Sequence, residues 1–331
     1  MMYGVYAREA MENTCSRKIY VDLIKAFGII FVVLGHANFA NDYIKEWLYS
    51  FHMALFFFAT GLTLKNSKID TIYISKKIQA LLVPFFIWAL IYSGYSLKRL
   101  PYLLYGSYWS INEANSLSSL WFLPTMFVAL IYAQLILKIK NKALLFLGMV
   151  VFFLLGVFLP HFSKGYVFGA DVAFLGAFFI LCGFLVEKNK IVAVGKRVCC
   201  LLACLMFLVT FLFFVNPVNE VDYVLMADRR LGNPAVFLIV ALAGCFLSYF
   251  AARSVESSSR IVKYFSYLGK NSLIIYLTHK PLLTLFCKFF PISGNIPWFV
   301  TLLAMLCFVL AVSIILARLV NRYAPALAGK K

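Results

Sequence analysis

Apolar residues fill long runs of the chain, and short polar segments separate these runs. A helix that spans a bilayer needs about 20 mostly apolar residues. The runs that meet this requirement are 21–39, 47–64, 78–97, 119–138, 143–160, 168–186, 198–215, 234–252, 271–290 and 297–319. The pattern therefore predicts an all-α protein, a polytopic bundle of about ten transmembrane helices.

The composition agrees with this pattern. Hydrophobic residue types make up 63% of the chain and charged types 13%, which is about half the charged fraction of a soluble domain. So much apolar surface cannot be hidden inside one globule of this length. We expect lipid to be its solvent.

Basic residues concentrate in every second polar segment, which indicates the orientation of the helices. With the N-terminus inside, the inner segments are 1–20, 65–77, 139–142, 187–197, 253–270 and the residues after 318. The outer loops hold few cations: Lys45, Lys98, Arg99, Lys164, Arg229 and Arg230. The positive-inside rule then places both termini in the cytoplasm. The same rule accounts for the net charge of +18, so we expect no nucleic acid partner.

These patterns divide the chain into three parts. Residues 1–20 form a charged cytoplasmic arm without the apolar core of a cleavable signal peptide. Residues 21–319 form the transmembrane domain, and 320–331 form a cytoplasmic tail.

The first predicted helix carries three ionisable residues, and such residues inside a membrane suggest function. At about 100° per residue, Lys25 and His36 lie within about 20° of one face, and Asp22 lies about 40° from it. This stripe should face the bundle, with Lys25 at the cytoplasmic mouth. His36 should lie about 16 Å further toward the outer side.

His52 lies near the outer end of the second predicted helix, at the expected depth of His36. Two histidines at one depth suggest acid/base chemistry, although a hydrogen-bonded packing pair is the alternative. We expect no metal site, because no carboxylate accompanies them at ligand spacing and the chain has no CxxC pair.

Other polar residues are candidates for lining a cavity. His279 and Lys280 precede Pro281, which should kink its helix and help to form a cavity. Asp171 is a lone carboxylate that could pair with Lys164 or with a histidine. Trp121 opens the fourth predicted helix, either as an interface anchor or as a stacking surface for a sugar. The Tyr/Trp-rich outer loop 98–118 leaves the same two alternatives open.

Five segments, in order along the chain, resemble the membrane acyltransferase 3 family, and most closely its fucose-4-O-acetylase-like branch. They read YVDLIKAFGIIFVVLGHANF, SFHMALFFFATG, KKIQALLVPFF, SLWFLPTMF and LGKNSLIIYLTH. The first is the most specific, because Lys25 and His36 match the family's basic residue, ten residues, then histidine. Many members also carry Arg-x-x-Arg before a proline. Here Lys77 and Ala80 stand at those positions, so the second basic residue is missing, although Lys76 could substitute for it.

The resemblance implies an O-acyltransferase of the bacterial plasma (inner) membrane. Such enzymes take an acyl group, usually acetyl, from cytoplasmic acyl-CoA and deliver it to a hydroxyl of a glycan or a lipid-linked saccharide. The resemblance makes His36 the catalytic residue and links Lys25 to the donor.

The residues fit this chemistry, since a sugar hydroxyl needs a base. His36, assisted or oriented by His52, can supply it. Lys25, Lys76 and Lys77 can meet the CoA phosphates, and Asp22 can neutralise Lys25 across one turn.

Acetyl-CoA is then a substrate, and we expect no tightly bound cofactor. The expected partners are acyl-CoA, the saccharide acceptor and the bilayer; the sequence does not predict the oligomeric state. Two other functions stay open: a transporter or flippase for a small polar or glycan substrate, and a non-catalytic channel or assembly protein.

Overall fold

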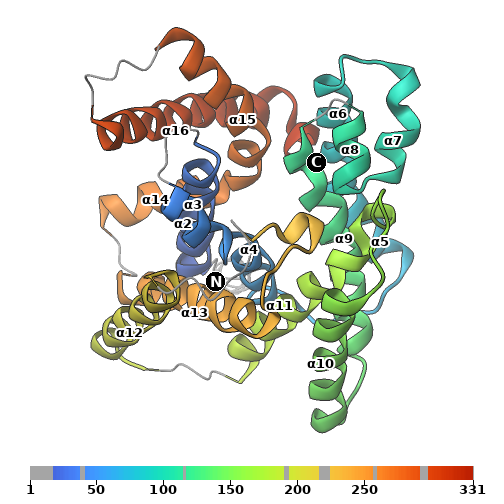
Figure 1. The fold of residues 1–331 in the computed structure, drawn as a ribbon, viewed down its shortest axis with the longest axis vertical. Helices are drawn as coiled ribbons and strands as arrows, with labels where there is room; N and C mark the ends of the chain where they lie inside the picture. Colours follow the sequence, from blue (N-terminus) through green and yellow to red (C-terminus); the bar gives the residue numbers. More distant parts are fainter. Residues whose placement is uncertain are drawn as a thin grey trace, which may run out of the picture.

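The computed structural model describes residues 18–37, 42–114, 117–189, 194–215, 224–255, 259–290 and 297–330. In these ranges the regular structure is helical, apart from one isolated β-bridge between Leu225 and Arg230. The predicted all-α bundle is confirmed (Figure 1).

Each predicted apolar run overlaps one or more helices. In chain order these are α2 (Ile19–Gly35), α3 (Asp42–Tyr49), α4 (His52–Gly61), the π-helix η1 (Ile78–Leu82), α6 (Val83–Tyr92), α9 (Phe122–Ile136), α10 (Lys142–Phe158), α11 (Ala170–Lys188), α12 (Lys196–Val215), α13 (Pro234–Val255), α15 (Ser272–Phe289) and α16 (Trp298–Tyr323). Helix α5 (Thr71–Lys77) comes just before the run 78–97. The run 47–64 differs from its prediction, because the chain breaks at Ser50 and Phe51 into α3 and α4.

Not every predicted span has the length of a membrane crossing. Among the described residues, 5 helices are long and apolar enough: Thr71–Tyr92, Ser118–Ile136, Val167–Lys188, Pro234–Ser254 and Trp298–Tyr323. The others are shorter or more polar, for instance α2, which has 17 residues and ends at Gly35. At α2 and at the run 47–64, the apolar run is therefore longer than the helix that forms.

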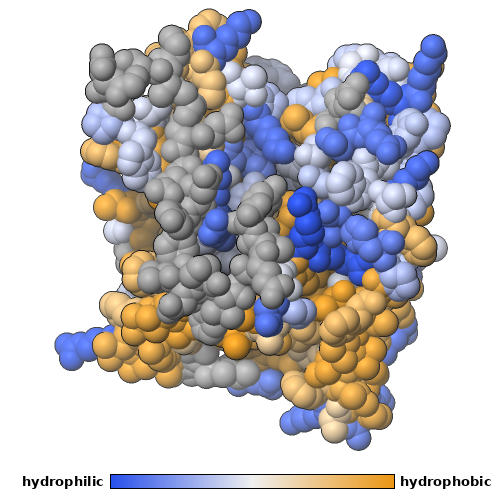
Figure 2. Space-filling view, in the orientation of Figure 1, coloured by the Kyte–Doolittle hydropathy of each residue, from blue (hydrophilic) through white to orange (hydrophobic). Residues whose placement is uncertain are grey.

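Helix α2 lies at the centre of the bundle and contacts α4, α13, α14 (Arg260–Lys270), α15 and α16 (Figure 1). Its side chains are buried on almost every face, so the first helix is the core of the bundle rather than a lipid-facing element. The large exposed apolar side chains gather elsewhere, and Figure 2 shows them over α10 and α12. This distribution places the polar stripe of α2 inside the protein.

Glycines bring α4 and α11 into backbone contact. A Cβ added at Gly61 would overlap the carbonyl of Ile180, and one added at Gly183 would overlap the carbonyl of Phe58. Small residues allow this close approach where membrane helices cross. The crossing fixes α4, and with it His52 at its start.

Short helices form outside the predicted spans. The aromatic loop folds into the 3-10 turn η2 (Leu97–Arg99), α7 (Leu100–Tyr105), α8 (Tyr108–Glu113) and the 3-10 turn η3 (Ser118–Trp121). Gly106 ends α7 in the left-handed conformation at φ +66°, where a residue without Cβ is favoured. These helices, and a loop at Val224–Leu231, form one end of the bundle around the site described next.

Candidate active site

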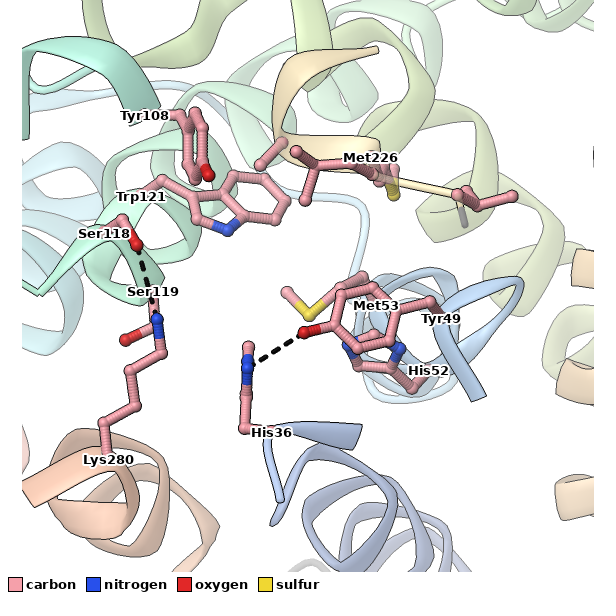
Figure 3. Close-up of a pocket in the computed structure, with 13 residues that line it drawn as sticks. His36, Tyr49, His52, Met53, Tyr108, Ser118, Ser119, Trp121, Met226 and Lys280 are labelled. Atoms are coloured by element: carbon pink, nitrogen blue, oxygen red, sulfur yellow. Dashed lines mark hydrogen bonds between the residues drawn. The ribbon is translucent and has the colours of Figure 1, made fainter. Parts of the chain in front are cut away.

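His36 terminates α2 and opens onto a cavity. Its backbone has φ −90° and ψ 0°, and its N–H still donates to the Val32 carbonyl, so the helix ends here. The cavity measures about 160 Å³, which is room for several waters. Five parts of the chain line it, namely the end of α2, the α3–α4 region, the α8–η3 region, residues 224–227 and Lys280 of α15 (Figure 3).

Tyr49 connects the two histidines of the predicted pair. Its hydroxyl lies 2.9 Å from Nδ1 of His36, and its ring packs edge-on against both His36 and His52. His52 also lines the cavity, but its Nδ1 donates to the Leu48 carbonyl at 2.7 Å. The structure thus brings both histidines to one cavity, with Tyr49 as the hydrogen-bond partner of His36 (Figure 3).

The sequence did not single out Tyr49. It lies in α3, three positions before His52, and the break at Ser50 and Phe51 separates α3 from α4. A periodicity argument for one unbroken helix cannot find a residue placed by such a break. The sequence feature that could have indicated Tyr49 is its position three residues before His52.

Of the two predicted cavity residues on α15, Lys280 lines the cavity, whereas His279 is not among the residues that line it. The His279 ring is fully buried, and its centroid lies 5.1 Å from that of His36. Its Nδ1 donates to the Tyr276 carbonyl at 2.5 Å. Lys280 lines the cavity, and its Nζ donates to Ser118 Oγ at 3.3 Å (Figure 3). Helix α15 runs through Pro281 without ending.

Aromatic and sulfur-containing side chains form the wall opposite His36. Trp121 and Tyr108 lie across the cavity from His36, beside Met226 (Figure 3). Trp121 is buried, so it faces the cavity rather than lying exposed at the surface. Tyr108 belongs to the Tyr/Trp-rich loop 98–118, for which the sequence left an interface anchor and a stacking surface for a sugar as alternatives.

The donor candidates Lys76 and Lys77 lie at a second cavity. It measures about 430 Å³ and is also lined by Lys65, Lys68 and Thr60 of α4. His52 and Thr60 are two turns apart on α4, about 12 Å along the axis. The Lys77 ammonium also lies 5.3 Å from the centre of the Tyr73 ring. Helix α4 therefore contributes residues to both cavities, His52 to one and Thr60 to the other.

Lys25 and Asp22 lie deeper along α2 and line neither of these two cavities. Lys25 is half-buried. Asp22 is buried, and its carboxylate accepts a hydrogen bond from Ser266 of α14 at 3.1 Å. Gly269 of α14 packs against the Asp22 backbone. These contacts hold α14 on α2.

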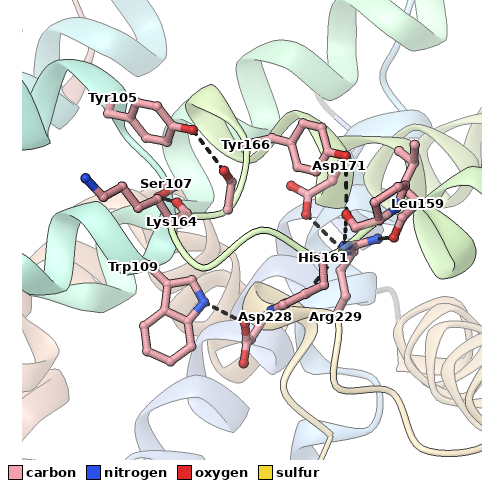
Figure 4. Close-up of polar contacts among 12 residues, drawn as sticks. Tyr105, Ser107, Trp109, Leu159, His161, Lys164, Tyr166, Asp171, Asp228 and Arg229 are labelled. Atoms are coloured by element: carbon pink, nitrogen blue, oxygen red, sulfur yellow. Dashed lines mark hydrogen bonds and ion pairs between the residues drawn. The ribbon is translucent and has the colours of Figure 1, made fainter.

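Asp171 lies outside the lining of the His36 cavity, at the start of α11. Its ion-pair partner is Arg229, with Nε 2.8 Å from Oδ2, rather than Lys164 or a histidine as the sequence suggested (Figure 4). Both side chains of the pair are buried. The sequence could not supply this partner, because the two residues lie on elements far apart along the chain.

Within the described ranges, no group of three or more His, Cys, Asp or Glu side chains is arranged to hold a metal ion. The residues around His36 are instead suited to proton transfer and hydrogen bonding: two imidazoles, two phenols, two serine hydroxyls and an ammonium.

Comparison with known proteins places this site in a family. A search of curated proteins gives no match. A family model described as an acyltransferase domain matches residues 18–318, a range that contains every residue of the two cavities. The chain therefore belongs to the acyltransferase 3 family and is a membrane acyltransferase.

Proposed function

We propose that this protein is an acyl-CoA-dependent O-acyltransferase. Its donor is acetyl-CoA, and its acceptor is a hydroxyl of a cell-surface polysaccharide or a lipid-linked sugar. One observation carries the proposal: within an acyltransferase domain, His36 opens onto a cavity and has a hydrogen-bond partner that fixes its ring. Nothing in the arrangement favours the transporter, whereas family membership favours the enzyme.

His36 acts as the general base in this proposal. It takes the proton of the acceptor hydroxyl as the hydroxyl oxygen attacks the thioester carbonyl, because an un-ionised hydroxyl is a weak nucleophile. A C–O bond forms and the C–S bond breaks. The proton then passes from His36 to the CoA thiolate.

Two groups on the other side of the cavity suit the charge that develops on the carbonyl oxygen. The Lys280 ammonium and the Ser118 hydroxyl are held together at 3.3 Å. Preorganised donors of this kind stabilise an oxyanion more than the neutral carbonyl from which it forms. We assign them this role, and we assign Trp121 and Tyr108 the role of packing against the acceptor sugar.

The cationic cavity is the proposed site for the CoA phosphates. Lys65, Lys68, Lys76 and Lys77 face it, and ammonium groups bind phosphates as point charges. With the termini in the cytoplasm of a bacterial inner membrane, this cavity faces the cytoplasm. The pantetheine arm then extends along α4 toward His36, and Lys25 on α2 lies beside this path.

The decisive experiment measures acetyl-CoA turnover by purified protein with a glycan acceptor. We expect His36→Ala to lower turnover by about 10² to 10⁴, the usual contribution of a general base. His161→Ala is the matched control, because His161 is half exposed and its ring contacts Asp228 instead. Unchanged turnover in His36→Ala would remove the base from the proposal.

A second experiment tests the donor side. Lys25→Ala should raise the KM for acetyl-CoA more than the KM for the acceptor, because in this proposal the lost charge lies beside the donor path. The opposite pattern would exclude a donor role. Mass spectrometry of surface glycans, with and without the protein, identifies the acceptor and the modified hydroxyl.

A further inference from the structure

The loop Val224–Leu231, here called the roof, closes one side of the His36 cavity. Its first four residues, from Val224 to Ala227, line the cavity together with His36. The bridge between Leu225 and Arg230 folds the roof back on itself around a 3-10 turn at Met226–Asp228. Most of its apolar side chains are buried, so the roof is packed down over the cavity.

Arg229 anchors the roof from behind. Its guanidinium forms the ion pair with Asp171 of α11, and its two terminal nitrogens donate to the carbonyls of Leu159 at 2.9 Å and Pro160 at 3.0 Å (Figure 4). The guanidinium thus joins the roof to the end of α10 and the start of α11. Because the side chain is buried, the roof cannot lift without leaving two opposite charges unpaired in a low-dielectric environment.

The backbone at Arg229 also indicates a constrained position. Its φ is +54°, in the left-handed region that a residue with a Cβ seldom adopts. Such a conformation persists where surrounding contacts determine it, and it is often found at functional sites. Here the backbone hydrogen bonds of the turn and of the bridge at Arg230 act together with the guanidinium contacts.

Asp228 provides a second tie, to α8. Its carboxylate accepts a hydrogen bond from Nε1 of Trp109 in α8 at 2.7 Å. Within the roof, Asp228 Oδ2 also lies 3.0 Å from Arg230 Nε and forms an ion pair with it. The Nε2 atom of His161 lies 3.4 Å from Asp228 Oδ1 (Figure 4). The roof is therefore fixed on two sides, and none of Asp171, Asp228 or Arg229 lines the cavity itself.

We infer that Arg229 is a positioning residue that holds the roof shut against water, so that the acyl group passes to the sugar hydroxyl and not to water. The inference rests on the proposed function. A base that deprotonates a sugar hydroxyl also deprotonates water. The water oxygen then forms the new C–O bond, the C–S bond breaks, and acetate and free CoA result. Excluding water is what separates transfer from hydrolysis.

Two adjacent arginines provide a matched test. Arg229 is buried and bound to Asp171, whereas the Arg230 side chain is half exposed and its ion pair is with Asp228. The experiment uses full-length protein in lipid nanodiscs and measures acetate release and acetyl transfer to a glycan in the same reaction.

We expect Arg229→Ala to raise the ratio of hydrolysis to transfer by about tenfold, because displaced closing elements admit water and misplace the acceptor. Asp171→Asn should shift the ratio in the same direction, and Arg230→Ala should leave it unchanged. Equal ratios in Arg229→Ala and Arg230→Ala would overturn the inference.

Met226→Ala covers the case in which Arg229→Ala fails to fold. It opens the cavity side of the roof and leaves the ion pair intact, so it should raise hydrolysis while Arg229 stays paired. Because Met226 is buried, its thermal midpoint is measured beside that of Arg229→Ala. If Met226→Ala leaves the ratio unchanged and Arg229→Ala changes the thermal midpoint alone, Arg229 is purely structural and the inference is overturned. A wild-type protein that neither transfers nor hydrolyses acetyl-CoA would instead reject the proposed function.

Discussion

Tyr49→Phe removes one hydroxyl from the active site and leaves the ring in place. The hydroxyl lies 2.9 Å from His36 Nδ1, and the ring packs edge-on against both histidines. Phenylalanine keeps these ring contacts. The substitution therefore tests whether the hydrogen bond to His36 contributes to catalysis.

The expected magnitude follows from this geometry. A single intramolecular hydrogen bond contributes about 0.5–1.5 kcal/mol. If Tyr49 holds His36 in the orientation needed at the transition state, this loss lowers kcat by about 2- to 13-fold, since about 1.4 kcal/mol corresponds to a factor of ten. Removal of the base itself costs about 10² to 10⁴. The two substitutions should thus be clearly separated.

The assay is steady-state acetyl transfer by wild type, Tyr49→Phe and His36→Ala, each with its thermal midpoint. We expect Tyr49→Phe to lower kcat, with both KM values close to those of wild type and the midpoint preserved. An unchanged kcat would show that the hydrogen bond does not orient the base. A loss as large as that of His36→Ala would show that Tyr49 itself transfers a proton, which also contradicts the orienting role.

Three further predictions concern other parts of the protein. Lys77→Ala should raise the KM for acetyl-CoA about 3- to 10-fold with little change in acceptor KM, as a lost phosphate contact does. Lys188 lies outside the cationic cavity, so Lys188→Ala should leave the KM for acetyl-CoA unchanged, and initial-rate kinetics compare the two variants. Trp121→Ala should weaken acceptor binding about 5- to 160-fold, since a stacked aromatic ring contributes about 1–3 kcal/mol. Isothermal titration with an acceptor oligosaccharide checks this, and unaltered affinity would exclude stacking. Gly183→Ala should destabilise the protein by about 1–3 kcal/mol by overpacking the crossing with Phe58, visible as a lower thermal midpoint in detergent; Gly195→Ala, which meets nothing within 4 Å, should leave the midpoint unchanged.

The sequence alone determined the class of the protein and the approximate position of its helices. Apolar runs of this length have few physical alternatives, because every backbone group in a bilayer must find a partner within its own helix. The same local geometry directed attention to His36 and Lys25, since helical periodicity fixes which residues of one helix share a face. The resemblance to the acyltransferase 3 family is confirmed by the match over residues 18–318. The donor, the acceptor and the role of His36 that it implies stay proposals.

The tertiary structure alone decided which residues meet at the site. His36 reaches Tyr49 across a helix break, lies beside His279 of α15, and shares its cavity with Trp121. Asp171 is paired with Arg229, a partner that the sequence did not suggest. Helical periodicity describes one helix at a time, whereas these contacts depend on how distant helices cross and where each one ends. Close crossings and helix ends arise from packing of the whole bundle, so they determined the surroundings of a histidine that the sequence had already identified.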